Sequence, residues 1–180
     1  METHLPRRKT SKKTRSTPPT PPSLLRKGVT YLFEGEEPSK AFLTFKKVLS
    51  EKKKGLCISR RYPPHLKEDF QLDQIPIYWL TRRKDEMTLD PVQLNGISHI
   101  VQQFIDISSP TIVLLDGIEY LIIQNDFKPV LRFIQHIRDE VLIQGSNLLL
   151  TLSPETLSLS EVRLLERDLE VFEVEKQSER

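Results

Sequence analysis

The stretch Thr111-Ile-Val-Leu-Leu-Asp-Gly-Ile-Glu119 carries the clearest indication of the fold. Residues 112–115 are all apolar, which is typical of a strand that is covered on both faces of a parallel sheet. Asp116 and Gly117 interrupt the strand, and the pattern predicts a short helix over 118–124. A strand that leads directly into a helix is the repeating unit of α/β proteins.

The same unit recurs on both sides of this stretch. Apolar runs predict further strands at 29–33, 56–59, 75–80 and 147–151. Helical spacing predicts helices that begin at Pro38, at Pro91 after an Asp90 cap, at 127–143 and at 160–172. Strands that alternate with helices pair in parallel through right-handed crossovers. We therefore expect a three-layer α/β fold with a mostly parallel, five-stranded sheet and helices on both faces.

Composition divides the chain into three parts. Residues 1–27 are rich in Pro, Ser and Thr and carry eight basic side chains and one acidic side chain, a net charge of +7 in a chain of net charge +2. Such a segment buries too little apolar surface to offset its ordering entropy, so we predict a disordered basic tail. An α/β domain over 28–173 and a charged extension over 174–180 follow.

Several classes of protein are disfavoured by what the chain lacks. No apolar run approaches the roughly 20 residues of a membrane-spanning helix, and no secretory signal is recognisable. Cys57 is the one cysteine and lies within a predicted strand, so we expect it to be buried. The histidines show no metal-ligand spacing. We expect a cytoplasmic protein without metal, cofactor or catalytic residues.

The turn after the first predicted strand decides against ATP hydrolysis. It reads Gly35-Glu-Glu-Pro-Ser-Lys-Ala41, whereas a phosphate loop has the pattern G-x-x-x-x-G-K-[ST]. The second glycine and the magnesium-binding hydroxyl are both missing. Glu36 and Glu37 would repel a phosphate, and Pro38 removes an amide donor. We expect the topology of a phosphate-loop NTPase without its phosphate loop.

Two acidic residues follow the strand at 111–115. An apolar strand that ends in Asp116 has the form of a Walker B magnesium site. The alternative is a helix cap, in which Asp116 accepts the amide of Glu119 and the Glu119 side chain reaches back. We favour the cap, because no phosphate loop is present to hold a nucleotide.

A set of cations follows two other predicted strands, and it comprises Arg60, Arg61, Arg82, Arg83 and Lys84. If these strands are neighbours, the cations share one edge of the sheet, where open parallel sheets bind ligands. Arginine binds carboxylates and phosphates well. The cations, with Asp116 and Glu119, are our candidate ligand or partner site. In the alternative, they pair with the acids near them or stay solvated. Tyr78 and Trp79 are interpreted as core.

The order of motifs resembles that of the archaeal domain-of-unknown-function family 835. The most specific segments are Leu114-Leu-Asp-Gly-Ile-Glu-Tyr-Leu-Ile122 and Leu152-Ser-Pro-Glu-Thr-Leu157. The resemblance implies a role in archaeal signalling and a core like that of RecA or KaiC ATPases. In that comparison, Arg60 and Arg61 occupy the positions of catalytic carboxylates. Since arginine stays protonated and cannot act as a general base, the resemblance implies a fold without hydrolysis.

Three functions follow as expectations. The first is a non-enzymatic regulatory or protein-interaction module that binds an acidic partner or anionic ligand at the carboxyl edge of the sheet. The second is a nucleotide-binding protein with residual affinity through Lys40 and Asp116. The third is a nucleic-acid-binding protein that uses the basic tail. The partner's identity and the oligomeric state are left open.

Overall fold

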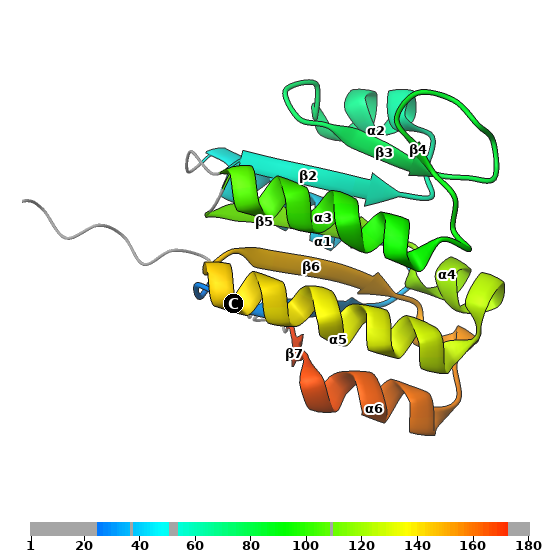
Figure 1. Ribbon diagram of the computed structural model, residues 1–180. Coiled ribbons are helices and arrows are strands. Elements are labelled where there is room, and N and C mark those ends of the chain that lie inside the picture. The colour runs from blue at the N-terminus through cyan, green and yellow to red at the C-terminus, as the bar shows by residue number, and fades with distance from the viewer. Residues whose placement is uncertain (1–24, 37, 51–53, 109, 173–180) are drawn as a thin grey trace, which may run out of the picture.

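A parallel sheet of seven strands forms the centre of the computed structural model, which describes residues 25–172 except 37, 51–53 and 109 (Figure 1). The predictions for residues 1–24 and 174–180 lie outside the described residues. The strand order is β4-β3-β2-β5-β6-β1-β7, and every pairing among the described residues is parallel. The strands are β1 (Thr30–Glu34), β2 (Lys54–Ser59), β3 (Ile77–Leu80), β4 (Thr88–Leu89), β5 (Thr111–Asp116), β6 (Asn147–Leu152) and β7 (Glu170–Val171).

The five predicted strands are confirmed as β1, β2, β3, β5 and β6, but the prediction of a five-stranded sheet is wrong. Strand β4 adds to the open side of β3, and β7 adds to the open side of β1. Each of these edge strands has two residues, 88–89 and 170–171, which is too short for an alternating apolar pattern. They become strands only because a longer strand offers them hydrogen-bonding partners.

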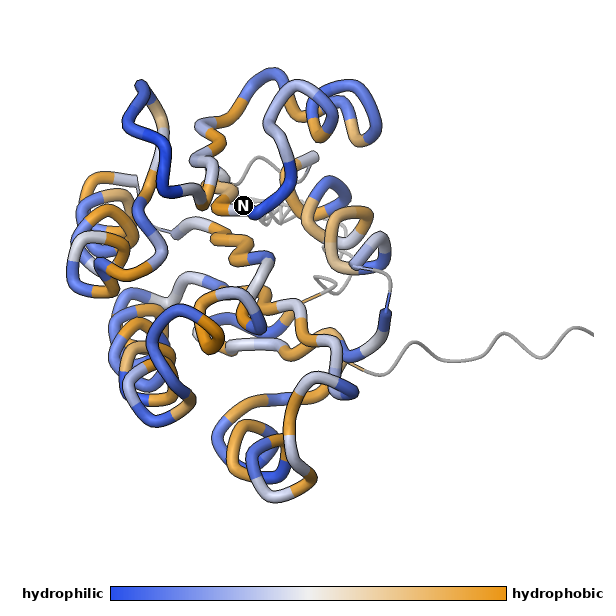
Figure 2. The backbone as a smooth tube through the Cα atoms, turned by 90° about the vertical axis from the view of Figure 1, so that its right-hand side faces the viewer, coloured by the Kyte–Doolittle hydropathy of each residue, from blue (hydrophilic) through white to orange (hydrophobic). Residues whose placement is uncertain are grey.

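Helices cover both faces of the sheet, as predicted (Figure 2). Helices α1 (Ser39–Ser50) and α2 (Pro63–Phe70) pack on one face. The other face carries α3 (Leu94–Ser108), α4 (Ile118–Asn125), α5 (Phe127–Gln144) and α6 (Leu159–Asp168), which follows the short 3-10 helix Pro154–Thr156. None of the helices in the described part of the chain is long and apolar enough to cross a membrane.

Strand β5 shows how the sequence fills both layers of core. Val113 and Leu115 pack in the cluster beneath α3, α4 and α5, whereas Ile112 and Leu114 pack in the cluster beneath α1 and α2. All four side chains have no exposed surface, because successive residues of a strand point to opposite faces. Cys57 is also fully buried, as predicted, and burial raises the pKa of its thiol above the usual range.

Two helix boundaries differ from the predictions. Asp90 does not cap α3 directly: its carboxylate accepts the amide of Val92 at 3.1 Å, and its carbonyl accepts the amide of Gln93 at 3.0 Å. A tight turn therefore precedes the helix, which begins at Leu94 and not at Pro91.

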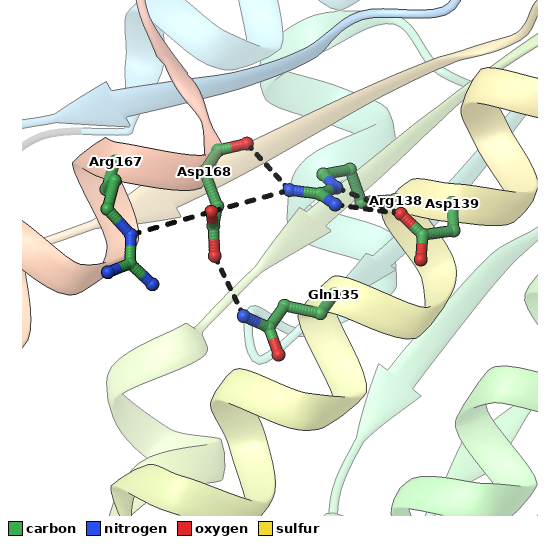
Figure 3. Close-up of polar contacts among 5 residues, drawn as sticks. All are labelled: Gln135, Arg138, Asp139, Arg167 and Asp168. Carbon is green, nitrogen blue, oxygen red and sulfur yellow. Dashed lines mark hydrogen bonds and ion pairs between the residues drawn. The ribbon is translucent and has the colours of Figure 1, made fainter.

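The last helix ends at Asp168, whereas the spacing predicted helix up to 172. Figure 3 shows the contacts that fix this end to α5: Asp168 accepts from Gln135 Nε2 at 2.8 Å, and its carbonyl accepts from Arg138 Nη1 at 3.2 Å. The chain then leaves the helix and pairs with β1, and Phe172 stacks on Phe33 with 4.5 Å between ring centroids. Burial of Phe172 against the sheet edge explains why the apolar pattern continued past the helix.

Candidate functional site

The carboxyl ends of β2, β5 and β6 meet around Asp116. Its carboxylate is 6% exposed and accepts hydrogen bonds from Ser59 Oγ at 2.6 Å and from Thr151 Oγ1 at 2.7 Å. The two hydroxyl oxygens are themselves acceptors, for the amides of Arg61 at 2.9 Å and of Gly117 at 3.3 Å. Asp116 therefore ties three neighbouring strands together through polar groups that are already paired.

The predicted capping box of Asp116 and Glu119 is wrong. Gly117 is the N-cap of α4, with φ of 113°, and no side chain caps this helix. Asp116 is still the last residue of β5 and lies in register with Ser59, so its side chain shares one face of the sheet with the side chains of Ser59 and Thr151. A Cβ atom at position 117 would lie 3.3 Å from Arg60 Cβ, so both the backbone conformation and the space favour glycine.

Glu119 holds the start of α4 to the end of β6. Its carboxylate accepts the amide of Ser153. Burial raises the pKa of Glu119, the hydrogen bonds from the amides of Ser153 and Glu119 itself lower it, and the nearby charge of Asp116 raises it, for a net rise. The hydrogen bond between the Ser153 amide and the Glu119 carboxylate holds the start of α4 against the end of β6.

Arg60 and Arg61 follow β2 but point to opposite faces of the sheet. The Arg60 guanidinium lies over the ring of Tyr120 in α4, 3.7 Å from its centroid, which is close enough for a cation–π contact. The Arg61 guanidinium lies 5.7 Å from the ring centroid of Phe42 in α1. The structure thus separates two cations that are adjacent in the sequence.

Arg82, Arg83 and Lys84 lie together beyond the end of β3, which is a neighbour of β2 as the prediction required. All three are exposed and line one pocket of about 530 Å³. The other residues lining it belong to the same loop, to β4 and to the start of α3, and Arg60 and Arg61 are not among them. The predicted set of five cations is therefore divided among three places.

The turn between β1 and α1 lacks features that a phosphate-binding loop for a nucleoside triphosphate requires. The amide of Gly35 already donates to the carbonyl of Leu152 at 3.0 Å, and Pro38 has no amide hydrogen. Burial raises the pKa of Glu34, and the adjacent carboxylate of Glu166 raises it further, so two acidic side chains lie close together at this end of β1. Lys40 is exposed. The amides of Ala41 and Phe42 likewise donate to the carbonyl of Pro38, at 3.0 and 3.3 Å, so at least three amides around this turn are already paired.

No three His, Cys, Asp or Glu side chains within the described ranges are grouped so that they could hold a metal ion. The carboxylates of Asp116 and Glu119 instead accept hydrogen bonds from hydroxyl and amide donors. Of the predicted site residues, Arg82, Arg83 and Lys84 are the ones that lie exposed together at one pocket.

Sequence reasoning overlooked two features of this edge. It recognised Ser59 only as a residue at a strand end, because its partner in space is set by the strand order. It also interpreted Trp79 as core, whereas Trp79 is only partly buried and lines a groove with Tyr62. The Pro63-Pro64 pair, which fixes the backbone beside that groove, was the available signal.

This architecture defines a three-layer α/β domain with a parallel sheet that helices cover on both faces. It is similar to a KaiC-like protein, PH0186, from the archaeon Pyrococcus horikoshii OT3, with a TM-score of 0.57, 11% identity and coverage of 77% of this chain and 69% of that one. It is also similar to PH0250 from the same organism, with a TM-score of 0.57, 15% identity and coverage of 81% of both chains. At such identities, the likeness shows the fold alone.

The chain belongs to the family described as "Protein of unknown function (DUF835)", whose profile matches residues 35–169. This confirms the resemblance that the sequence motifs indicated. A comparison with curated proteins found no match.

Proposed function

We propose that this chain is a non-enzymatic regulatory module that binds an acidic segment of a partner protein in the pocket of Arg82, Arg83 and Lys84. The observation that carries this proposal is that three consecutive cations line one pocket, while none of them forms an ion pair within 4.0 Å among the described residues. Guanidinium groups can make paired hydrogen bonds to a carboxylate or phosphate, which supports recognition of an acidic side chain.

The charge of the pocket lining supports a peptide over a polyanion. Asp85, Glu86 and Asp90 also line the pocket, so its net charge is close to zero. Such a surface attracts a nucleic acid weakly, because that attraction depends on several uncompensated cations. A peptide that carries one or two acidic side chains beside neutral hydrogen-bonding groups matches the mixed lining better.

The arrangement of the central residues supports binding over catalysis. The Asp116 carboxylate accepts hydrogen bonds from two hydroxyl groups, and the Glu119 carboxylate accepts one from a backbone amide. Because these groups occupy the carboxylates, neither is placed to take a proton from a substrate. Arg82 and Arg83 present hydrogen-bond donors and no acceptor, so they do not serve as general bases. The chemistry that remains is recognition of anionic groups.

The proposal is tested by fluorescence anisotropy with a fluorescein-labelled peptide that carries two glutamates among serine and glycine residues. We expect saturable binding that the variant Arg82→Ala/Arg83→Ala loses. The matched control is Lys128→Ala/Arg132→Ala, which removes two exposed cations from α5 and should bind like the parent. Equal loss in both variants would mean that net charge, and not this pocket, governs binding.

A calorimetric titration with magnesium ATP tests the absence of a nucleotide site. We expect no heat of binding at millimolar nucleotide, because at least three amides around the β1–α1 turn are already paired. Saturable heat that Lys40→Ala abolishes would favour the nucleotide-binding alternative.

A further inference from the structure

A second pocket, of about 350 Å³, lies between the start of α2 and the β3–β4 edge, and it shares Asp85, Glu86 and Thr88 with the pocket of the proposed function. Aromatic, proline and methionine side chains dominate its lining. We call it the aromatic groove and define it by Tyr62, Pro63, Pro64, Pro76, Trp79 and Met87. It shares no cation with the pocket of the proposed function.

The two aromatic rings of the groove form fixed walls. The centroids of Tyr62 and Trp79 lie 5.2 Å apart, with the ring planes inclined by 65°. Trp79 Nε1 donates to the carbonyl of Arg60 at 3.0 Å, which fixes the orientation of the indole. Tyr62 is 48% exposed although it is a large aromatic residue. Rigid aromatic walls that stay open to solvent are the features that grooves for proline-rich peptides use.

Acidic side chains stand at one end of the groove. Asp85 and Glu86 belong to its lining, both are exposed, and neither forms an ion pair with another described residue. Lys67 also lines the groove. A ligand with a cationic side chain next to apolar, proline-rich residues would therefore match both parts of the surface.

The chain itself contains such a ligand in Arg15-Ser-Thr-Pro-Pro-Thr-Pro-Pro22. A polyproline II helix has three residues per turn, so Arg15, Pro18 and Pro21 fall on one edge of it. Proline-rich segments favour this conformation in isolation and lose little entropy when they dock. We propose that the aromatic groove binds the segment 15–22 of a second copy of this chain, with prolines against the rings and Arg15 at Asp85 and Glu86.

The reach of the chain is the reason for assigning the segment to a second copy. Arg26 lies near β1, because its carbonyl accepts from Asn147 Nδ2 at 2.6 Å and its guanidinium pairs with Glu170 of β7. From β1 to β3 the sheet order crosses β6, β5 and β2, a distance of about 19 Å at normal strand spacing. The four residues from Pro21 to the buried Leu25 span at most about 14 Å. Pro21 therefore cannot reach the groove of its own chain.

A peptide titration tests the groove directly. The receptor is the full chain with Pro18→Ala/Pro21→Ala, and the probe is a peptide of residues 12–24. Trp79 is the one tryptophan of the sequence, so its emission reports on the groove. We expect a saturable change in emission. A peptide with Pro18 and Pro21 replaced by alanine should bind at least about tenfold more weakly, a loss of about 1.4 kcal/mol or more in binding free energy.

Receptor variants locate the binding. Adding Tyr62→Ala to the receptor should lower its affinity for the wild-type peptide at least about tenfold, as expected when an aromatic anchor is removed. Adding Ile123→Ala, which removes an exposed apolar side chain on α4, should leave affinity unchanged. The comparison of the two peptides uses an unaltered groove, so it holds even if the Tyr62 variant folds poorly. Equal affinity for both peptides, or no emission change, overturns the proposal.

Sedimentation velocity tests the second copy. We expect the wild-type full chain to self-associate as its concentration passes the dissociation constant of the peptide, and the Pro18→Ala/Pro21→Ala chain to stay monomeric at the same concentration. Charge reversal by Asp85→Lys/Glu86→Lys should weaken self-association, and the effect should diminish at high salt. A wild-type chain that stays monomeric well above that concentration overturns the assignment to a second copy.

Discussion

The carboxyl end of the sheet contains two polar regions that differ in how their groups are paired. At the centre, around Asp116, carboxylate, hydroxyl and amide groups satisfy one another in a buried network. At the edge beyond β3, Arg82, Arg83 and Lys84 are exposed and form no ion pair among the described residues. A polar side chain at the carboxyl end of a parallel sheet is therefore not a binding residue by its location alone. The unpaired groups are the ones available to a partner.

The largest effect is expected when the central network loses its common acceptor. Asp116→Ala leaves the hydroxyls of Ser59 and Thr151 without their partner in a buried environment, and we expect the free energy of unfolding to fall by about 3 kcal/mol. Urea denaturation measures this change. Asp73→Ala, at an exposed aspartate, is the control and should change stability by less than about 0.5 kcal/mol. Similar losses in both variants would contradict a stabilising role for the network around Asp116.

Replacing two glycines with alanine should change the free energy of unfolding in opposite directions, which sharpens the comparison. Gly117→Ala should destabilise by about 1–3 kcal/mol, because φ of 113° is unfavourable for alanine and the new Cβ would crowd Arg60. Gly96→Ala, at an exposed position in the first turn of α3 with no atom closer than 3.8 Å to the new Cβ, should stabilise by about 0.4–1 kcal/mol. Thermal and urea unfolding of both variants check the signs. Destabilisation by both would contradict the account of position 117.

Glu119 provides a smaller effect that depends on pH. A pKa that is raised in the folded state means that the folded protein binds the proton more tightly, so this contribution to stability is present at low pH and is lost as pH rises through the folded-state pKa. Glu119→Gln keeps an acceptor for the amide of Ser153 and removes the buried charge. We expect it to be more stable than the parent at pH 7 by about 0.5 kcal/mol, and equal to it below about pH 4. Urea denaturation from pH 3.5 to 8 tests this, and an advantage that grows toward acid would contradict it.

The smallest effect on stability is expected at the edge. Arg82→Ala/Arg83→Ala should change the free energy of unfolding by less than about 0.5 kcal/mol, because both side chains are exposed and unpaired among the described residues. The same variant should nevertheless lose binding of the acidic peptide. A stability loss comparable to that of Asp116→Ala would show that these arginines serve the fold and not a partner.

Much of the fold could be predicted, because periodicity and turn residues act over a few neighbouring positions. The five long strands, the short helix after Asp116 and the burial of Cys57 follow from local patterns and are confirmed. The two edge strands could not be predicted, because two residues carry no period. The ends of α3 and α6 differed because a turn at Asp90 and a strand at 170–171 replaced the expected helical turns.

The candidate site was predicted less completely, and the reason is distance along the chain. Ser59 and Asp116 bond across 57 residues, and Asp116 and Thr151 across 35, so their pairing depends on the strand order β2-β5-β6. Arg60 and Arg61 are consecutive residues, and their guanidinium groups lie on opposite faces, at Tyr120 of α4 and at Phe42 of α1. Sequence placed seven candidate residues at one end of the sheet, and the structure distributed them among hydrogen bonds at Asp116 and Glu119, aromatic contacts of Arg60 and Arg61, and an exposed pocket.

By itself, the sequence determined the parallel α/β architecture and the composition of the turn after the first strand, because strand and helix periodicity and the residues of one turn are local properties. Only the tertiary structure decided which carboxylates are consumed by hydrogen bonds, which cations stay exposed together, and that Tyr62 and Trp79 form a groove. These outcomes depend on strand order and on the face of the sheet to which each side chain points, and neither is encoded within a few residues of the groups concerned.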